Sequence, residues 1–181
     1  NEPSFDVTTV SLRNQRSSQS YQRWELAFSV QPDMYQPQDL LVDMLPEASA
    51  RSSMIMPQFL RVSRDTTATG VVQASTQYNT GASNLIFNTT AASGILPRGA
   101  FVKFSNHDKV YILKEELDLS GSTAPAEIYP RLRNTVTSSD LLNYGDDAIL
   151  SYKRNIDIGT GITFSDGLLA NPGTIALVED L

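Results

Sequence analysis

Hydrophobic and polar residues alternate with a period of two in several short stretches of this chain, which is the pattern of half-buried β-strands. The clearest stretch is residues 23–30. One of its faces carries Trp24, Leu26, Phe28 and Val30, and the other carries Arg23, Glu25, Ala27 and Ser29. Residues 5–10 are rich in β-branched side chains and predict a second strand.

Strand patterns also dominate the second half of the chain. Residues 101–104, 109–113 and 126–129 are three strand candidates, with a tight turn at 106–108 and a longer loop at 121–125. Residues 71–94 are rich in small polar residues, but Val71, Val72 and the apolar run 85–87 favour thin strands over a linker. Another strand region is expected within 148–158, ended by the glycines that follow it.

One segment changes to a helical period. Pro37 suits the first turn of a helix, where its missing N–H costs nothing. Apolar residues then recur at spacings of three and four, at Leu40, Leu41, Met44 and Leu45. Because Pro46 should end this element, the pattern predicts one short helix at 37–45.

These elements predict a mainly β protein, a small β-barrel or sandwich with one short helix and extended loops or arms. The expected organisation is an N-terminal hairpin with the helix at 1–62, followed by a barrel-like unit with a C-terminal arm at 63–181. The two parts can also form one shared domain, since 181 residues suit either arrangement.

Composition narrows the function classes. Hydrophobic residues make up 40% of the chain and charged residues 19%, which is typical of a globular protein. The net charge of −6 disfavours specific nucleic-acid binding, because phosphate contacts need Lys and Arg. There is no cysteine, so disulfides and thiolate chemistry are excluded. No apolar run is long enough to span a membrane, and no signal peptide is visible.

Catalytic residues are sparse. The single histidine, His107, lies in the expected turn beside Asp108. We interpret it as a turn residue rather than as a general base. Neighbouring carboxylates occur at Glu115–Glu116 and Asp146–Asp147, but adjacent residues on a strand point to opposite faces. We therefore expect no enzyme activity, no metal site and no cofactor.

Candidate contact residues lie in the connections. The polar segment 14–20 is interpreted as a solvated hairpin loop or, alternatively, as a loop that docks on a neighbouring subunit. Arg13, Arg16 and Tyr21 would then make the contacts. Arg131 and Arg133 are two positions apart on an extended segment, so they could grip a partner carboxylate or form an ion pair within the chain.

Two passages resemble tailed-bacteriophage tail and baseplate proteins. The first is QRWEL at 22–26, preceded by a strand and a Ser/Gln/Arg-rich loop. The second runs from LPRG at 96–99 through FVKF at 101–104 and KVYIL at 109–113 to IYPRLR at 128–133. The resemblance covers most of the chain, although residues 46–72 and 162–181 depart from the pattern.

The resemblance implies a structural virion protein. It would be made in the bacterial host cytoplasm and would form a ring, often hexameric, that joins the tail tube to hub or other baseplate proteins. Its partners would be copies of itself and other tail proteins. The alternatives are a carbohydrate-binding β-module, drawing exposed aromatics from Tyr21, Tyr35, Tyr78 or Tyr144, and a cell-wall hydrolase.

Overall fold

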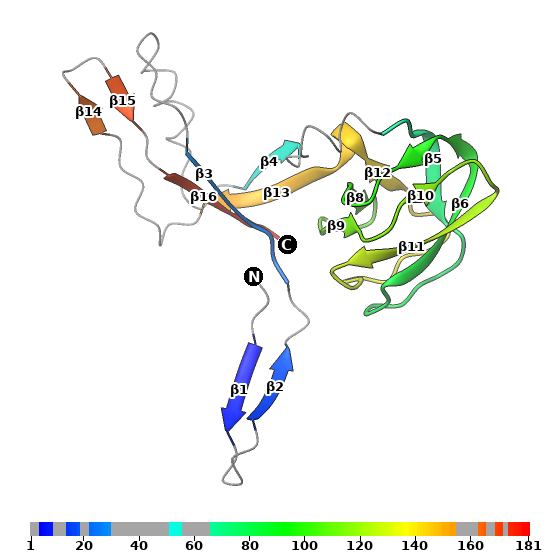
Figure 1. Cartoon of the computed structure of the whole chain (residues 1–181), viewed down its shortest axis with the longest axis horizontal. Coiled ribbons are helices and arrows are strands. Elements are labelled where there is room, and N and C mark those ends of the chain that lie inside the picture. The colour runs from blue at the N-terminus through cyan, green and yellow to red at the C-terminus, as the bar shows by residue number, and fades with distance from the viewer. Residues whose placement is uncertain are drawn as a thin grey trace. The chain divides into compact units, whose positions relative to one another are not determined.

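The chain forms two compact units, each assembled from separate segments (Figure 1). A computed structural model describes residues 4–8, 14–18, 22–29, 51–55, 66–154, 163–165, 169–171 and 174–181. One unit combines Arg23–Ser53 with Ser151–Asp180, and the other contains Glu2–Gln22 and Met54–Leu150. The described elements are strands, apart from a single 3₁₀ turn, η1 at Gly145–Asp147. The expectation of a mainly β protein is therefore confirmed.

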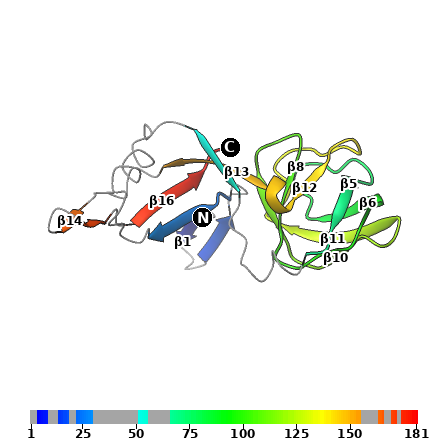
Figure 2. The same cartoon turned by 90° about the horizontal axis from the view of Figure 1, so that it is seen from above.

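The larger unit is built on a six-stranded antiparallel sheet that curls into a nearly closed barrel (Figures 1 and 2). Its order is β12-β8-β9-β11-β6-β5. The strand bounds are Thr69–Ala74 for β5, Asn84–Ser93 for β6, Phe101–Phe104 for β8, Val110–Leu113 for β9, Thr123–Tyr129 for β11 and Leu142–Tyr144 for β12. A short pair, β7 at Ile95–Leu96 with β10 at Leu117–Asp118, adjoins this sheet in the chain. The strands expected around 71–94, 101–113 and 126–129 are confirmed.

The inward face of this sheet forms the core. Phe104 lies at its centre, stacked on Phe87 at a ring-centroid distance of 6.3 Å and edge-on to Tyr111 at 5.8 Å. All three rings are fully buried. Along β11, buried and exposed side chains alternate, with Ala124, Ala126 and Ile128 facing inward. The period of two in the sequence thus places the apolar residues inside.

A glycine corner separates β6 from β7. Gly94 has φ +91°, and a Cβ atom there would lie 2.2 Å from the carbonyl oxygen of Thr67. The close approach is held by Ile95, whose N–H donates to Thr67 Oγ1 at 3.0 Å and whose carbonyl accepts from Thr67 N–H at 3.2 Å. Only a residue without a side chain fits both the φ and the space.

The smaller unit holds a four-stranded sheet of order β3-β16-β13-β4. The bounds are Glu25–Ser29 for β3, Ser52–Ile55 for β4, Ile149–Arg154 for β13 and Thr174–Glu179 for β16. Over residues 23–27 exposed side chains alternate with half-buried ones, which confirms the predicted period of two in that part. β16 is an inner strand of this sheet, paired with β3 on one side and with β13 on the other.

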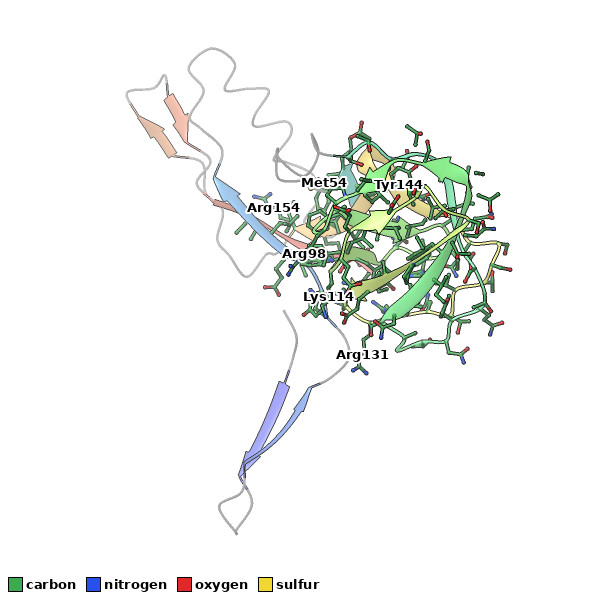
Figure 3. All side chains as sticks on the ribbon, turned by 45° about the vertical axis from the view of Figure 1, so that its right-hand side comes forward. Met54, Arg98, Lys114, Arg131, Tyr144 and Arg154 are labelled. Carbon is green, nitrogen blue, oxygen red and sulfur yellow. The ribbon has the colours of Figure 1, made fainter. Side chains whose placement is uncertain are left out.

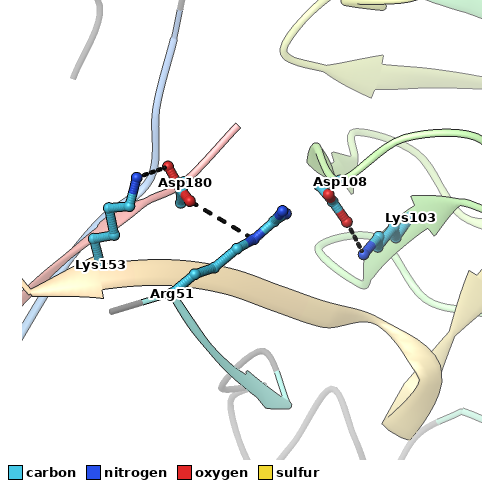
Figure 4. Close-up of polar contacts among 5 residues, drawn as sticks. All are labelled: Arg51, Lys103, Asp108, Lys153 and Asp180. Atoms are coloured by element: carbon cyan, nitrogen blue, oxygen red, sulfur yellow. Dashed lines mark hydrogen bonds and ion pairs between the residues drawn. The ribbon is translucent and has the colours of Figure 1, made fainter. Parts of the chain in front are cut away.

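Polar contacts tie the last residues of the smaller unit together. Glu179 is 1% exposed and accepts the Trp24 N–H on Oε2 at 3.0 Å, while its own N–H donates to the Trp24 carbonyl at 2.8 Å. Asp180 pairs with Lys153 at 2.9 Å and Arg51 at 3.6 Å (Figure 4). Ion pairs at the surface contribute little to the free energy of folding. The reciprocal Trp24–Glu179 hydrogen bonds therefore stabilise this part of the sheet more.

Two hairpins stand apart from both sheets in their strand pairing. β1 at Ser4–Thr8 pairs with β2 at Asn14–Ser18, and β14 at Thr163–Ser165 pairs with β15 at Leu169–Asn171. Within the described part of the chain, each is a two-stranded sheet. The strand expected at 5–10 is confirmed for residues 5–8, and residues 9 and 10 lie outside the described residues. The prediction that 14–20 is a loop is wrong for 14–18. Backbone hydrogen bonds form this ladder although β2 contains no apolar residue, and the next strand, β3, pairs with β16 instead.

Two other expectations fall outside the described residues. The helix predicted at 37–45 is one, and the domain boundary at 62/63 is the other. Both stay predictions.

Replacing Gly94 by Ala tests the corner. Gly94→Ala should lower the free energy of unfolding by more than about 3 kcal/mol, since it adds a clash with Thr67 to the strain of a positive φ. Gly99→Ala is the matched control, because Gly99 has φ +89° and nothing within 4 Å of the added Cβ. It should cost only about 1–2 kcal/mol. Urea unfolding of both variants measures the difference, and equal losses would contradict the steric argument.

Candidate functional site

The predicted contact residues lie at different places in the chain. Arg131 is exposed (Figure 3). Arg133 is half-buried, and Leu132 between them is 2% exposed. Arg16 lies in β2 at the register position opposite Asp6. Arg13 and Tyr21 fall outside the described residues. The structure therefore places the Arg131–Arg133 pair on one segment of the larger unit but does not test its role.

A hydrogen-bonded cluster around His107 holds that segment. His107 lies in the turn after β8, as the sequence predicts, and its ring stacks on Phe104 at 5.9 Å. Its Nε2 lies 2.7 Å from Tyr111 Oη and its Nδ1 2.5 Å from Asn106 Oδ1. Tyr111 Oη also accepts the backbone N–H of Arg133 at 3.0 Å. The phenol therefore joins the turn to the arginine segment.

The neighbours of His107 determine its tautomer. The amide nitrogen of Asn106 donates to the Thr135 carbonyl at 2.9 Å and to Asp140 Oδ2 at 3.1 Å, which leaves Asn106 Oδ1 as an acceptor. His107 Nδ1 must then carry the proton that Oδ1 receives, and Nε2 accepts the Tyr111 hydroxyl proton. A neutral imidazole satisfies both contacts at once.

Burial keeps this imidazole neutral. It lowers the pKa of His107 from 6.5 to about 4, and the charges of Lys103 and Arg133 act in the same direction, against the opposing effect of Asp140 and Asp108. Both ring nitrogens are committed to neighbouring side chains. Such a histidine is suited to ordering the surrounding segments rather than to accepting a substrate proton.

A cavity of about 330 Å³ lies beside this cluster. Its lining includes Asn106, His107, Asp108, Lys109 and Arg133. Two of the charged groups are engaged nearby: Asp108 pairs with Lys103 at 2.9 Å (Figure 4), and the buried Lys109 donates to the Gln22 carbonyl at 2.9 Å. Asp108 and Lys109 in the lining are thus held by contacts with groups outside the cavity.

The two carboxylate pairs of the sequence lie at exposed positions. Glu115, Glu116, Asp146 and Asp147 are all exposed. Among the described residues, no three His, Asp or Glu side chains are grouped so that they could hold a metal ion. The described residues also include no α-helix with the length and apolar character of a membrane-crossing segment.

A second cavity, of about 450 Å³, lies between β5 and β12, the two end strands of the barrel-like sheet. Sequence reasoning missed it, because it depends on which strands end the sheet. Tyr144 reaches across and donates its hydroxyl proton to the Gly70 carbonyl at 2.8 Å. Burial, together with the nearby Asp147, raises the pKa of this phenol. Val71 and Leu141, 47% and 38% exposed, lie in the lining.

Two of the tyrosines considered for sugar stacking already make contacts within the barrel-like unit. The rings of Tyr78 and Tyr144 pack against the core, and the Tyr78 hydroxyl accepts the Ile86 N–H at 2.8 Å. A cavity of about 310 Å³ beside Tyr78 is also lined by Asn84, Glu115 and Glu127. Tyr21 and Tyr35 fall outside the described residues. The carbohydrate-binding alternative stays a prediction.

Comparison with known proteins adds no family assignment. No protein-family model matches the chain, and no curated protein sequence matches it either.

The buried histidine predicts a pH dependence of stability. Between pH 6.5 and about 4, the unfolded chain binds a proton at His107 that the folded chain does not bind. Stability from this group is therefore complete above pH 6.5 and is lost as the pH falls toward 4. The melting temperature should fall by a few degrees from pH 7.5 to 5.0, while His107→Gln, which cannot titrate, should flatten that decline. An unchanged slope in the variant would contradict the role of His107.

The Tyr111 hydroxyl has a separate test. Tyr111→Phe keeps the ring but leaves the Arg133 N–H and His107 Nε2 without this partner, so it should lower the free energy of unfolding by about 1–3 kcal/mol. The double variant with His107→Gln should lose less than the sum of the two single losses, since both remove one shared hydrogen bond. Denaturant unfolding of the four proteins gives the coupling energy, and strict additivity would argue against a connected cluster.

Proposed function

We propose that this chain is a structural protein of a phage tail or baseplate, which assembles with copies of itself in a ring and contacts other tail proteins. It would act in the virion through its interfaces, without catalysis. The proposal rests on the resemblance of residues 22–26 and 96–133 to tail proteins and on one structural observation, the two hairpins that pair with neither sheet in the described part of the chain.

The hairpins carry the argument because a two-stranded sheet is marginally stable by itself in water. The strands β1 and β2 together contain only two apolar residues, Phe5 and Val7. So small an apolar content cannot supply a core of its own, and stability must come from contact with something else. A protein whose working state is an assembly supplies such contacts from its neighbours.

The Arg131–Arg133 segment is held in one conformation by its contacts, which agrees with a binding role. Leu132 anchors this segment in the core, Tyr111 Oη accepts the Arg133 N–H, and Asn106 donates to the carbonyl of nearby Thr135. A pre-ordered segment loses little conformational entropy on binding, so its exposed Arg131 is well suited to an ion pair with a partner carboxylate.

The proposal predicts a stoichiometric virion component. In particles of a phage that encodes this chain, the protein should co-sediment with intact virions at a fixed multiple of the portal copy number, and antibody labelling should mark the tail. The purified full chain should also form a closed oligomer in sedimentation velocity. A chain that is absent from washed particles, and monomeric at all concentrations, would refute the proposal.

A further inference from the structure

Arg133 lines the cavity of about 330 Å³ beside His107, together with its neighbour Asn134. Arg133 is half-buried, and within the described residues its guanidinium has neither a hydrogen-bond nor an ion-pair partner. A guanidinium that is partly withdrawn from water gains most from an acceptor that carries a negative charge. The cavity is therefore suited to an anion.

The structure holds Arg133 in position beside the cavity. Burial is the main cause of the lowered pKa of His107, and the positive charge of Arg133 adds to it, so the guanidinium acts on this lining residue. The backbone is fixed as well, because the Arg133 N–H donates to Tyr111 Oη at 3.0 Å and Leu132 is 2% exposed. A donor on a fixed backbone loses little conformational freedom when it binds a ligand.

The shape and charge of the lining favour a carboxylate as the anion. The planar fork of an arginine matches the two oxygens of a carboxylate, and the exposed Asn134 carries an amide nitrogen that can donate to the same group. Asp108 also lines the cavity, and although it pairs with Lys103, its charge repels a doubly charged phosphate more than a singly charged carboxylate. The volume is near the lower end for ligand sites, which suits a small group.

We propose that the cavity beside His107 is a carboxylate site, in which Arg133 binds both oxygens of the group and Asn134 donates to one of them. An aspartate or glutamate side chain of a second copy and a free organic acid present this same chemistry. The site differs from the exposed Arg131, which is not part of the cavity lining. The inference does not rest on the proposed tail function, so either can fail without the other.

Titration of the full chain with sodium acetate tests the site. Acetate replaces chloride at constant ionic strength, and ¹H–¹⁵N NMR follows the backbone N–H of residue 133 and the side-chain amide of Asn134. Both signals should shift and reach saturation. Arg133→Gln should weaken acetate binding about tenfold or more, because it removes the charge and the paired donors.

Arg98→Gln is the matched control. It makes the same change of charge at an exposed position of the same unit, outside the cavity lining. This variant should bind acetate as the parent chain does. Equal weakening in the two variants would mean that only the overall charge matters, and would overturn the site.

The melting temperature distinguishes a binding role of Arg133 from a structural one. Arg133→Gln removes a half-buried charge but keeps the backbone N–H that donates to Tyr111. Without acetate, the variant should melt at the same temperature as the parent chain or higher. Acetate should raise the melting temperature of the parent chain but not of the variant. A fall of several degrees in the variant without acetate would mean that the guanidinium holds the fold, and would overturn the proposal.

Two further measurements establish the class of anion and its source. Inorganic phosphate that binds more tightly than acetate would overturn the assignment to a carboxylate, and the absence of saturable acetate shifts would overturn the site itself. In sedimentation velocity, self-association that both acetate and Arg133→Gln weaken, and Arg98→Gln does not, assigns the carboxylate to a second copy. Acetate binding without an effect on self-association supports the site and assigns it to a free organic acid.

Discussion

The barrel-like unit depends on the burial of one face of a six-stranded sheet. A sheet of this size has no separate layer of helices in the described residues, so it must bury its apolar face by curling on itself. Phe104 is central to that arrangement, because it contacts Phe87, His107 and Tyr111 from one position on β8. Curling brings β5 and β12 toward each other but joins them by only one bridge in the described chain. The core and the cavity between β5 and β12 therefore have the same origin.

The polar cluster at His107 connects the buried aromatic core to the segment around Arg133. Tyr111 is fully buried, yet its hydroxyl serves both the turn after β8 and the backbone of Arg133. A neutral histidine can accept from this hydroxyl and donate to Asn106 at the same time, whereas a charged one cannot. The aromatic core thus orders a connecting segment that would otherwise have to be held by its own few apolar residues.

Assembly is the common theme of the proposed function and of the two hairpins that pair with neither sheet in the described part of the chain. Strand pairing between chains uses backbone groups, so it needs little specific side-chain chemistry. That agrees with a chain in which the conspicuous feature is the arrangement of strands and the two carboxylate pairs, Glu115–Glu116 and Asp146–Asp147, are exposed. It also explains why a polar segment such as β2 can be important without a recognisable motif.

The sequence by itself determined the local elements. Alternation at residues 23–30 and the strand–turn–strand pattern at 101–113 follow from a period of two and from turn residues, both of which act over a few neighbours. The turn position of His107 was predicted for the same reason. Segment 14–18 was missed as a strand because its polar residues give no burial signal, although its backbone pairs with β1.

Only the tertiary structure decided which distant segments meet. The pairing of β3 with β16 joins residues about 150 apart, and the Gln73–Leu141 bridge joins residues about 70 apart. Neither local propensity nor hydrophobic period encodes such partners, because many strands of similar pattern are equally suitable. The choice is made by the burial of a whole sheet face at once.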